Sequence, residues 1–236
     1  MNSRTLRLQL SLVALTVTIP IASGQDPGQY HPLSQRTPLG QTAAWLRHIH
    51  GAQDDWRQPL VFQVDGGAEV AVFSAGPQPE AVVTDSTPVA VTPRHTYRLR
   101  LASMPEFPGV ELFPTIEVLD RLHPPAGQAD RYPVPVTFSK YDIQQALAGA
   151  LVTRVIYLED PETAQLTDPL HREFPQEVTP AENVLQRADQ LGRPMVIIRL
   201  GNRRPSLSSS SPLTWGTGGV VQMRERPADQ PAGAIQ

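Results

Sequence analysis

The sequence predicts an α+β fold that is predominantly β, either an antiparallel sheet or a β-sandwich, with two short helices in late connections. Three observations support this fold class. About eight short apolar or alternating segments lie between residues 60 and 200, separated by turn-forming Gly and Pro residues. Two helix patterns occur in connections near the end of this region. No period of 20–50 residues repeats, which argues against a solenoid or a propeller.

Composition separates a core from its flanks. The chain of 236 residues contains 25 prolines, and its apolar fraction of 40% is low for a globular domain. The domain organisation that we expect is a signal peptide at residues 1–24, a Pro-rich tether at 25–59, a β-rich core at 60–201 and a disordered Ser/Pro/Gly-rich tail at 202–236. The tether contains one helix pattern at residues 42–50, with Thr42 as N-cap. Its apolar side would consist of Trp45, Leu46 and Ile49, and we expect this helix to dock on the core rather than on a partner.

The N-terminus is typical of a secretory signal peptide. Arg4 and Arg7 precede an apolar stretch at residues 8–21, and residues 22–24 are small and allow cleavage before Gln25. A membrane anchor needs about 20 apolar residues, and no second run is long enough to span a bilayer. We therefore expect export to the periplasm or the exterior, with no transmembrane segment in the mature chain.

The first half of the core consists of short strand patterns. Asp65-Gly66-Gly67 is a tight-turn signal between two of them and predicts a hairpin. Arg98 and Arg100 alternate with apolar residues, which is typical of a half-exposed antiparallel strand. The strands expected in this half are residues 60–64, 68–73, 88–92 and 96–101.

Two proline-containing segments follow. Residues 110–122 are ambiguous: their period of two favours a strand, with Pro114 at an edge or a bulge, but Pro114 could also open a helix. Residues 132–138 alternate cleanly. Pro133 and Pro135 cannot donate ladder hydrogen bonds, so we expect an edge strand there.

The last part of the core alternates helices and strands. Ser139 as N-cap with Asp142 at N3 starts one helix, and Thr179 as N-cap starts a second; the stop signals are Gly149 and Gly192. Residues 151–158 are apolar on both alternating faces, which predicts a strand covered on both sides at the centre of a sheet. Residues 195–200 predict a second buried strand.

Charged residues on and near the central pattern are the candidates for a site. Arg154 lies mid-strand, where a buried guanidinium needs a carboxylate. Glu117 and Asp120 are the expected partners, in an ion pair that fixes register; the alternative is an arginine that awaits an anionic ligand. Glu159 and Asp160 follow the strand, and paired carboxylates of this kind can serve in glycoside hydrolysis or Ca²⁺ binding. These five residues are the candidate ligand-binding set.

Other chemistry is absent from the sequence. The chain has no cysteine, which excludes a thiol nucleophile, disulfides, Cys-ligated zinc and iron–sulfur clusters. It has no HExxH motif and no Gly-x-Ser-x-Gly elbow, and the glycine-rich stretch at 216–219 lacks the Lys-Ser/Thr of a phosphate loop. The group formed by His48, His50, Asp54 and Asp55 resembles a metal site but lies in the tether. We expect no catalytic residue, metal or cofactor, and a net charge of −3 argues against a nucleic-acid partner.

Four stretches taken together resemble a known group of proteins. They are residues 97–100, 109–125, 151–161 and 188–194, in the middle of the chain. The group consists of secreted proteins of unknown function from planctomycete-type bacteria. The resemblance implies export and a cell-envelope or extracellular setting, and it carries no activity or site.

The leading interpretation is an exported, non-enzymatic envelope or extracellular protein with a β-rich interaction module, whose partner is an envelope protein or a glycan. One alternative is a carbohydrate-active enzyme of the envelope that uses Glu and Asp residues near Glu159. The other is a periplasmic accessory subunit that docks through the Trp45 segment.

Overall fold

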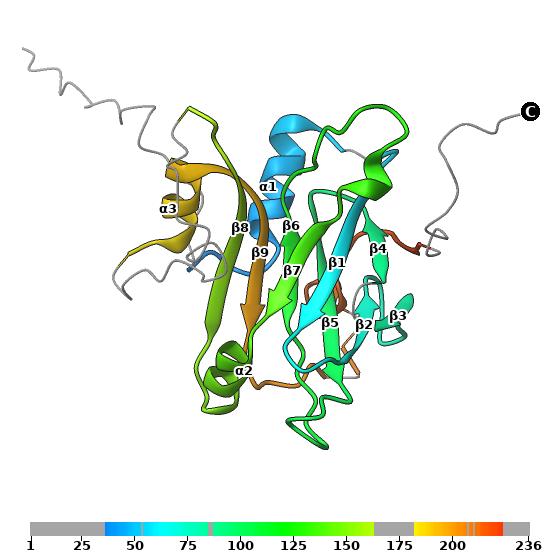
Figure 1. Cartoon of the computed structure of the whole chain (residues 1–236), viewed down its shortest axis with the longest axis vertical. Helices are drawn as coiled ribbons and strands as arrows, with labels where there is room; N and C mark the ends of the chain where they lie inside the picture. Colours follow the sequence, from blue (N-terminus) through cyan, green and yellow to red (C-terminus); the bar gives the residue numbers. More distant parts are fainter. Residues whose placement is uncertain are drawn as a thin grey trace, which may run out of the picture. The chain divides into compact units, whose positions relative to one another are not determined.

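Two β-sheets form the protein in a computed structural model, which describes residues 36–52, 54–84, 87–162, 182–206, 208–209 and 211–223 (Figure 1). The predicted signal peptide lies outside these residues. Sheet A has the order β10 (Val220–Gln222), β4 (Pro88–Val91), β1 (Gln58–Val64) and β7 (Val134–Phe138). Sheet B has the order β3 (Ala81–Thr84), β2 (Glu69–Phe73), β5 (His95–Ala102), β6 (Thr115–Val118), β9 (Gly192–Leu200) and β8 (Val152–Glu159). Among the described strands, β1 and β7 are parallel and the other pairs are antiparallel. The predicted α+β, predominantly β fold is confirmed.

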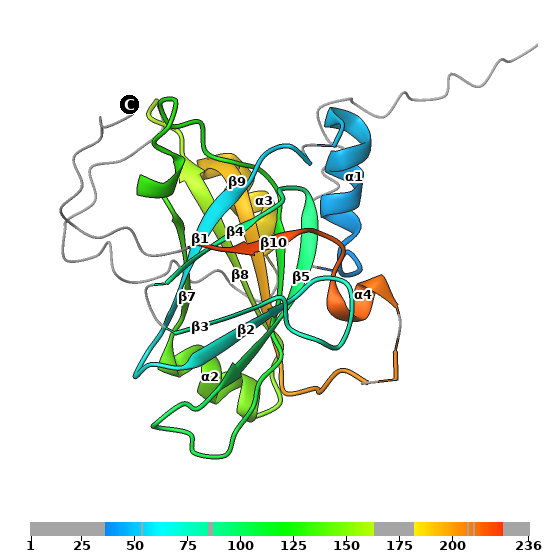
Figure 2. The same cartoon turned by 90° about the vertical axis from the view of Figure 1, so that its right-hand side faces the viewer.

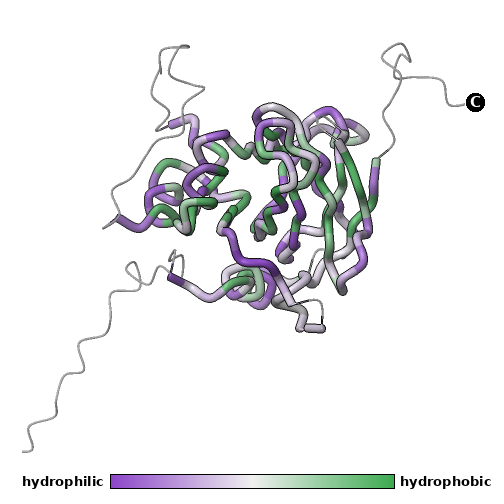
Figure 3. The backbone as a smooth tube through the Cα atoms, turned by 90° about the horizontal axis from the view of Figure 1, so that it is seen from below, coloured by the Kyte–Doolittle hydropathy of each residue, from purple (hydrophilic) through white to green (hydrophobic). Residues whose placement is uncertain are grey.

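The main core lies between the inner faces of the two sheets. Alternate residues of the strands supply it, as the period of two requires, and Figure 3 shows hydrophobic residues (green) interspersed with hydrophilic ones (purple) along the backbone. Helix α2 (Lys140–Leu147) adds Ile143 and Ala146 to the same cluster. The largest contributors include Leu60, Phe62, Tyr97, Leu99, Ile116 and Ile198, all buried. The arrangement is a β-sandwich with helices on the sides of sheet B (Figure 2).

The predicted hairpin at residues 65–67 is wrong. β1 and β2 belong to different sheets, so the turn carries the chain from sheet A to sheet B. Gly66 and Gly67 both have positive φ, 82° and 84°, which glycine adopts without steric cost. Asp65 fixes the turn, because its carboxylate accepts a hydrogen bond from the Lys140 N–H at 2.9 Å. A glycine turn signal shows where the chain reverses, but it does not show that the flanking strands pair.

The predicted central position of residues 151–158 is also wrong. β8 is the edge strand of sheet B, and β9 is its neighbour in the sheet. Its side chains are half-buried or exposed. Val152 and Ile156 pack against the core between the sheets, while Val155 packs against Leu185 of α3 (Val184–Leu191) on the other face. Cover on both faces therefore gives an edge strand the apolar pattern of a central one.

The two proline-containing segments behave largely as predicted. β6 confirms the strand interpretation of residues 110–122, but it lies between β5 and β9 rather than at an edge. Pro114 precedes the first residue of β6, and its carbonyl accepts a hydrogen bond from the Leu99 N–H at 2.8 Å. β7 is an edge strand of sheet A, as its prolines require, with Pro135 exposed.

The ends of helices α2 and α3 agree with the predicted caps, except for the start of α3. Ser139 and Asp142 form the predicted capping box of α2. The start of α3 was predicted at Thr179, which lies outside the described residues; the N-cap is Asn183, whose side chain accepts from the Leu185 N–H at 3.2 Å. Gly192 ends α3 as predicted. A Cβ there would lie 2.1 Å from the Leu158 carbonyl oxygen, so this close approach to β8 requires glycine.

Both flanks join the core. Helix α1 (Gln41–His50) docks on sheet B as predicted, through Ala43 and the half-buried Leu46, but its N-cap is Gly40 instead of Thr42, and Trp45 and Ile49 are exposed. The predicted disorder of the tail is wrong for residues 211–223. This segment forms α4 (Pro212–Trp215) and β10. Its Trp215 is buried against Phe73, with ring centroids 5.2 Å apart.

Buried charges from the sheet B side of the molecule fix both ends of α1. At the N-terminal end, Glu117 on β6 accepts a hydrogen bond from the Ala43 N–H at 3.3 Å and pairs with Arg199 on β9. At the C-terminal end, Arg94 donates to the carbonyls of His50 (3.0 Å) and Gly51 (2.7 Å). A carboxylate at the N-terminus and a guanidinium at the C-terminus both complement the helix dipole. These contacts make α1 part of the folded core.

Replacement of Glu117 tests this arrangement. Glu117→Gln is expected to lower the free energy of unfolding by about 3–5 kcal/mol, because it leaves the Arg199 guanidinium buried without a carboxylate. Denaturant unfolding measures the loss. The control is Glu69→Gln, whose ion pair with Arg100 is partly exposed and should contribute about 1 kcal/mol or less. Equal losses in the two variants would contradict a special role for the buried pair.

Candidate functional site

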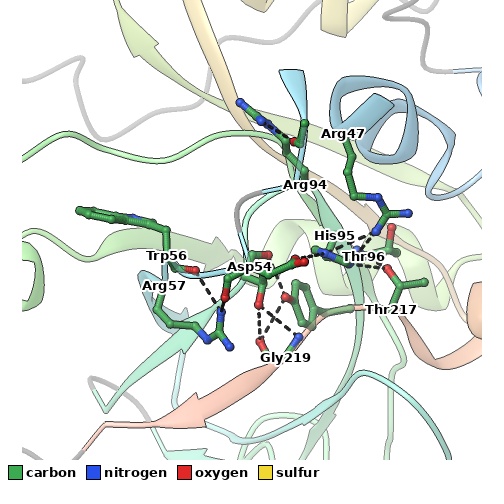
Figure 4. A network of polar contacts seen from close by, with 12 residues as sticks. Arg47, Asp54, Trp56, Arg57, Arg94, His95, Thr96, Thr217 and Gly219 are labelled. Atoms are coloured by element: carbon green, nitrogen blue, oxygen red, sulfur yellow. Dashed lines mark hydrogen bonds and ion pairs between the residues drawn. The ribbon is translucent and has the colours of Figure 1, made fainter. Parts of the chain in front are cut away.

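Three separate parts of the chain meet at His95, the first residue of β5 (Figure 4). Arg47 of α1 places a guanidinium nitrogen 3.1 Å from the His95 Nδ1, and the Thr217 hydroxyl lies 3.0 Å from the same atom. An Asp54 carboxylate oxygen lies 3.6 Å from Nε2. The imidazole itself is buried. These four residues, the His95 cluster, join the helix, the loop before β1 and the C-terminal segment.

The environment favours the neutral imidazole. Burial lowers the pKa of His95 below its ordinary value of 6.5, and the Arg47 guanidinium acts in the same direction; Asp54 and Thr217 oppose them. Arg47 can only donate, and its nitrogen is closer to Nδ1 (3.1 Å) than to Nε2 (3.4 Å), so we assign the proton to Nε2, on the side of the Asp54 carboxylate. The cluster therefore holds an uncharged histidine between an arginine and an aspartate.

A hydroxyl, an imidazole and a carboxylate are also the components of a hydrolase triad. In this cluster, however, Arg47 contacts the same ring nitrogen as the Thr217 hydroxyl, so the two compete for one lone pair. The backbone of Thr217 is held as well, because its N–H donates to the Thr96 carbonyl at 2.9 Å. The geometry connects chain segments and does not activate the threonine as a nucleophile.

Glycines let the C-terminal strap, residues 214–222, approach β5 closely at residues 216–218 before it pairs with β4. A Cβ on Gly218 would lie 1.9 Å from the Tyr97 hydroxyl, and one on Gly216 would lie 2.3 Å from the Thr96 carbonyl oxygen. Gly216 also has a φ of 113°, which favours glycine. The Tyr97 hydroxyl donates to the Thr92 carbonyl at 2.8 Å beneath the strap. The glycine-rich stretch thus has a packing role, which its sequence context did not reveal.

Arg154 has a different partner from those predicted. Its guanidinium binds the Asp142 carboxylate twice, with Nε–Oδ2 at 2.7 Å and Nη2–Oδ1 at 2.5 Å. Arg154 lies on the side of β8 that faces α2, whereas Glu117 lies on the opposite side of the sheet, where it binds Arg199. The expectation of an ion pair is confirmed, but its assignment to Glu117 or Asp120 is wrong.

The five predicted ligand-binding residues do not converge. Asp120 binds Arg193 at 2.9 Å, apart from the pairs formed by Arg154 and Glu117. Glu159 and Asp160 are exposed at the end of β8, and the Asp160 carboxylate accepts a hydrogen bond from the Glu162 N–H at 3.0 Å. Sequence reasoning missed the His95 cluster because its members come from four distant positions.

Two further observations concern the described ranges. There, no three His, Asp or Glu side chains stand close enough to hold a metal ion. Asp54, one of the four residues in the motif that resembles a metal site, faces His95 instead. No helix in the same ranges has the length and apolar character needed to cross a bilayer.

The outer edge of β8, here called the β8 edge, is the second candidate. No other described strand pairs with it. Leu151, just before the strand, is 69% exposed, and Leu158 within it is 45% exposed. Tyr141 and Leu147 of the adjoining helix α2 are exposed as well, at 54% and 36%. A strand edge that no described strand pairs with, beside exposed large apolar side chains, is typical of a binding surface.

Comparison of the chain with protein-family models, curated proteins and solved structures found no match. No relative therefore assigns a role to either candidate. Three chain segments contact one another in the His95 cluster, whereas no described strand pairs with the outer edge of β8.

The His95 cluster predicts a specific pH dependence of stability. Because folding lowers the pKa of His95, the unfolded chain binds more protons as pH falls below about 6.5. The stabilisation is complete above that pH and is lost as pH falls toward the folded-state pKa. Wild type should therefore lose more unfolding free energy than His95→Gln between about pH 8 and about pH 5.

Thermal or denaturant unfolding across this range measures the difference between the two proteins. His123→Gln, at an exposed position, is the control and should follow wild type. Parallel profiles for wild type and His95→Gln would contradict the assignment.

The close approach of the strap to β5 gives a second expectation. Gly218→Ala should lower the melting temperature strongly, because the new methyl group overlaps the Tyr97 hydroxyl and must displace the strap. The control is Gly76→Ala, where a Cβ meets nothing within 4 Å. Thermal unfolding compares them, and a Gly218→Ala protein as stable as the control would show that the strap does not lie against Tyr97.

Proposed function

We propose that the protein is exported and acts in the cell envelope or outside the cell as a non-enzymatic interaction module. The signal-like residues 1–24 and the resemblance to secreted proteins support export. The β8 edge carries the interaction proposal. Its partner is an envelope protein or a glycan.

Backbone N–H and C=O groups along a sheet edge are ready to pair with another chain, and proteins often use this for recognition. At the β8 edge, exposed Leu151 and Leu158 add apolar area whose burial is favourable. In the His95 cluster, by contrast, the polar groups already contact one another. Binding is therefore better supported than catalysis.

The enzyme alternative has less support. A glycosidase needs two carboxylates on either side of a bound sugar, about 5–10 Å apart. Glu159 and Glu162 are exposed near one strand end and do not enclose a substrate. The accessory-subunit alternative has one specific observation in its favour: Trp45 and Ile49 are exposed four residues apart on α1.

One experiment addresses export and binding together. The full chain is expressed in a bacterial host, and the mature protein starting at Gln25 is sought in the periplasm and medium by mass spectrometry. The recovered protein is then immobilised, and capture of protein or glycan from envelope extracts is measured. Leu151→Glu should reduce capture at least about tenfold by adding a charge to the apolar surface.

The matched control is Val82→Glu, at an exposed apolar position on the other edge strand of sheet B; it should capture as wild type does. Uncleaved protein retained in the cytoplasm would contradict export. Absent capture, or equal capture by Leu151→Glu and wild type, would contradict an interaction module at the β8 edge.

A further inference from the structure

Among the described strands, four lie at a sheet edge, and the β8 edge offers the longest backbone stretch for an added strand. It offers eight residues, whereas β3 and β10 offer four and three. β7 has five, but Pro135 has no N–H to donate. β8 contains no proline, and its β-branched residues favour extended backbone. Those residues are Val152, Thr153, Val155 and Ile156.

Two features limit where another chain can pair. The ladder between β8 and β9 is irregular between Ile156 and Tyr157, and such irregularities discourage indiscriminate edge pairing. Arg154 points toward α2 and is held by both carboxylate oxygens of Asp142. Its guanidinium is therefore committed and does not project across the edge. Residues 152–156 remain as a regular stretch for pairing.

The two ends of the edge differ in chemistry. Near its start, Leu151 is 69% exposed, and Leu147 at the end of α2 is 36% exposed, so this is the apolar end. Near its finish, Glu159 and Glu162 are exposed, together with Asp160.

Two arginines lie near the acidic end. Arg193, opposite Leu158, is bound to Asp120. The charge of Arg187 on α3 acts to lower the pKa of Tyr157, and the charge of Glu159 acts to raise it. With the three carboxylates, these groups leave the end acidic.

We propose that the β8 edge binds an extended segment of a partner protein as an additional antiparallel strand, with basic residues in the segment's N-terminal half and apolar residues in its C-terminal half. This inference deepens the proposed function and rests on it. Antiparallel pairing places the start of the segment beside Glu159 and its finish beside Leu151. Basic side chains then meet the acidic end, and apolar side chains cover the exposed leucine.

A second copy of the chain fits less well. Two β8 strands paired about a two-fold axis would place the acidic end of each beside the apolar end of the other. That arrangement places Glu159 and Glu162 beside apolar side chains and brings Leu151 next to charge. Charge complementarity therefore favours a different polypeptide.

Synthetic peptides test the inference on the mature protein. The probe has two lysines, an alternating Thr/Val middle and two leucines, in that order. A second peptide replaces the lysines with glutamates. A third keeps the side chains of the first but carries N-methyl groups on alternate amides, so it cannot complete a ladder. Fluorescence anisotropy measures their affinities for wild type, for Glu159→Lys and for Asp55→Lys. Asp55 is an exposed control position in the loop before β1, outside the β8 edge.

Wild type should bind the lysine peptide at least about tenfold more tightly than the glutamate and N-methylated peptides. Glu159→Lys should weaken the preference for the lysine peptide over the glutamate peptide, and Asp55→Lys should leave it unchanged. Equal affinity for the first and third peptides would overturn strand addition. Concentration-dependent dimers that Leu151→Glu disrupts would overturn the assignment to a different polypeptide.

The outcome also separates this inference from the broader proposal. If envelope capture depends on Leu151 but no peptide binds, strand addition is wrong and the interaction module stands. If neither capture nor peptide binding occurs, the proposed function itself is contradicted.

Discussion

One buried carboxylate determines how the outer side of sheet B is covered. Glu117 binds Arg199 on the neighbouring strand and also accepts the Ala43 N–H of α1. Removing such charges from water costs several kcal/mol for each ion, so the pair is tolerable only when hydrogen bonds and cover are complete. Helix α1 supplies both, and Arg94 holds its other end. The helix is consequently a structural part of the domain, although it precedes the first strand.

This docking has consequences for where the protein can interact. With α1 in place, Arg47 reaches His95, and the glycine-rich strap closes the same region through Thr217. The inner face of sheet B is covered by sheet A and α2. Within the described ranges, the long open edge that remains is that of β8, flanked by exposed apolar residues. The polar groups of the His95 cluster contact one another, and no described strand pairs with the outer edge of β8. These two observations are the physical reason for favouring binding over catalysis.

Local signals in the sequence predicted local structure well. Alternation identified β5 and β7, an apolar run at residues 195–200 identified β9, and the Ser139–Asp142 capping box identified the start of α2. Properties that depend on distant contacts were not predictable. β8 resembled a central strand because helices cover both its faces, and Asp142 was interpreted as a helix cap although it also binds Arg154. The order of residues 211–223 depends on Trp215 reaching Phe73, which composition does not reveal.

Native-state hydrogen exchange of the α1 amides tests the central claim most directly. If buried charges make α1 part of the core, its hydrogen-bonded amides, including the Ala43 N–H that binds Glu117, should exchange with the same opening free energy as amides of β5 and β9. Exchange of α1 through a local opening of much lower free energy, while β5 and β9 stay protected, would contradict the account and return this segment to the status of a tether.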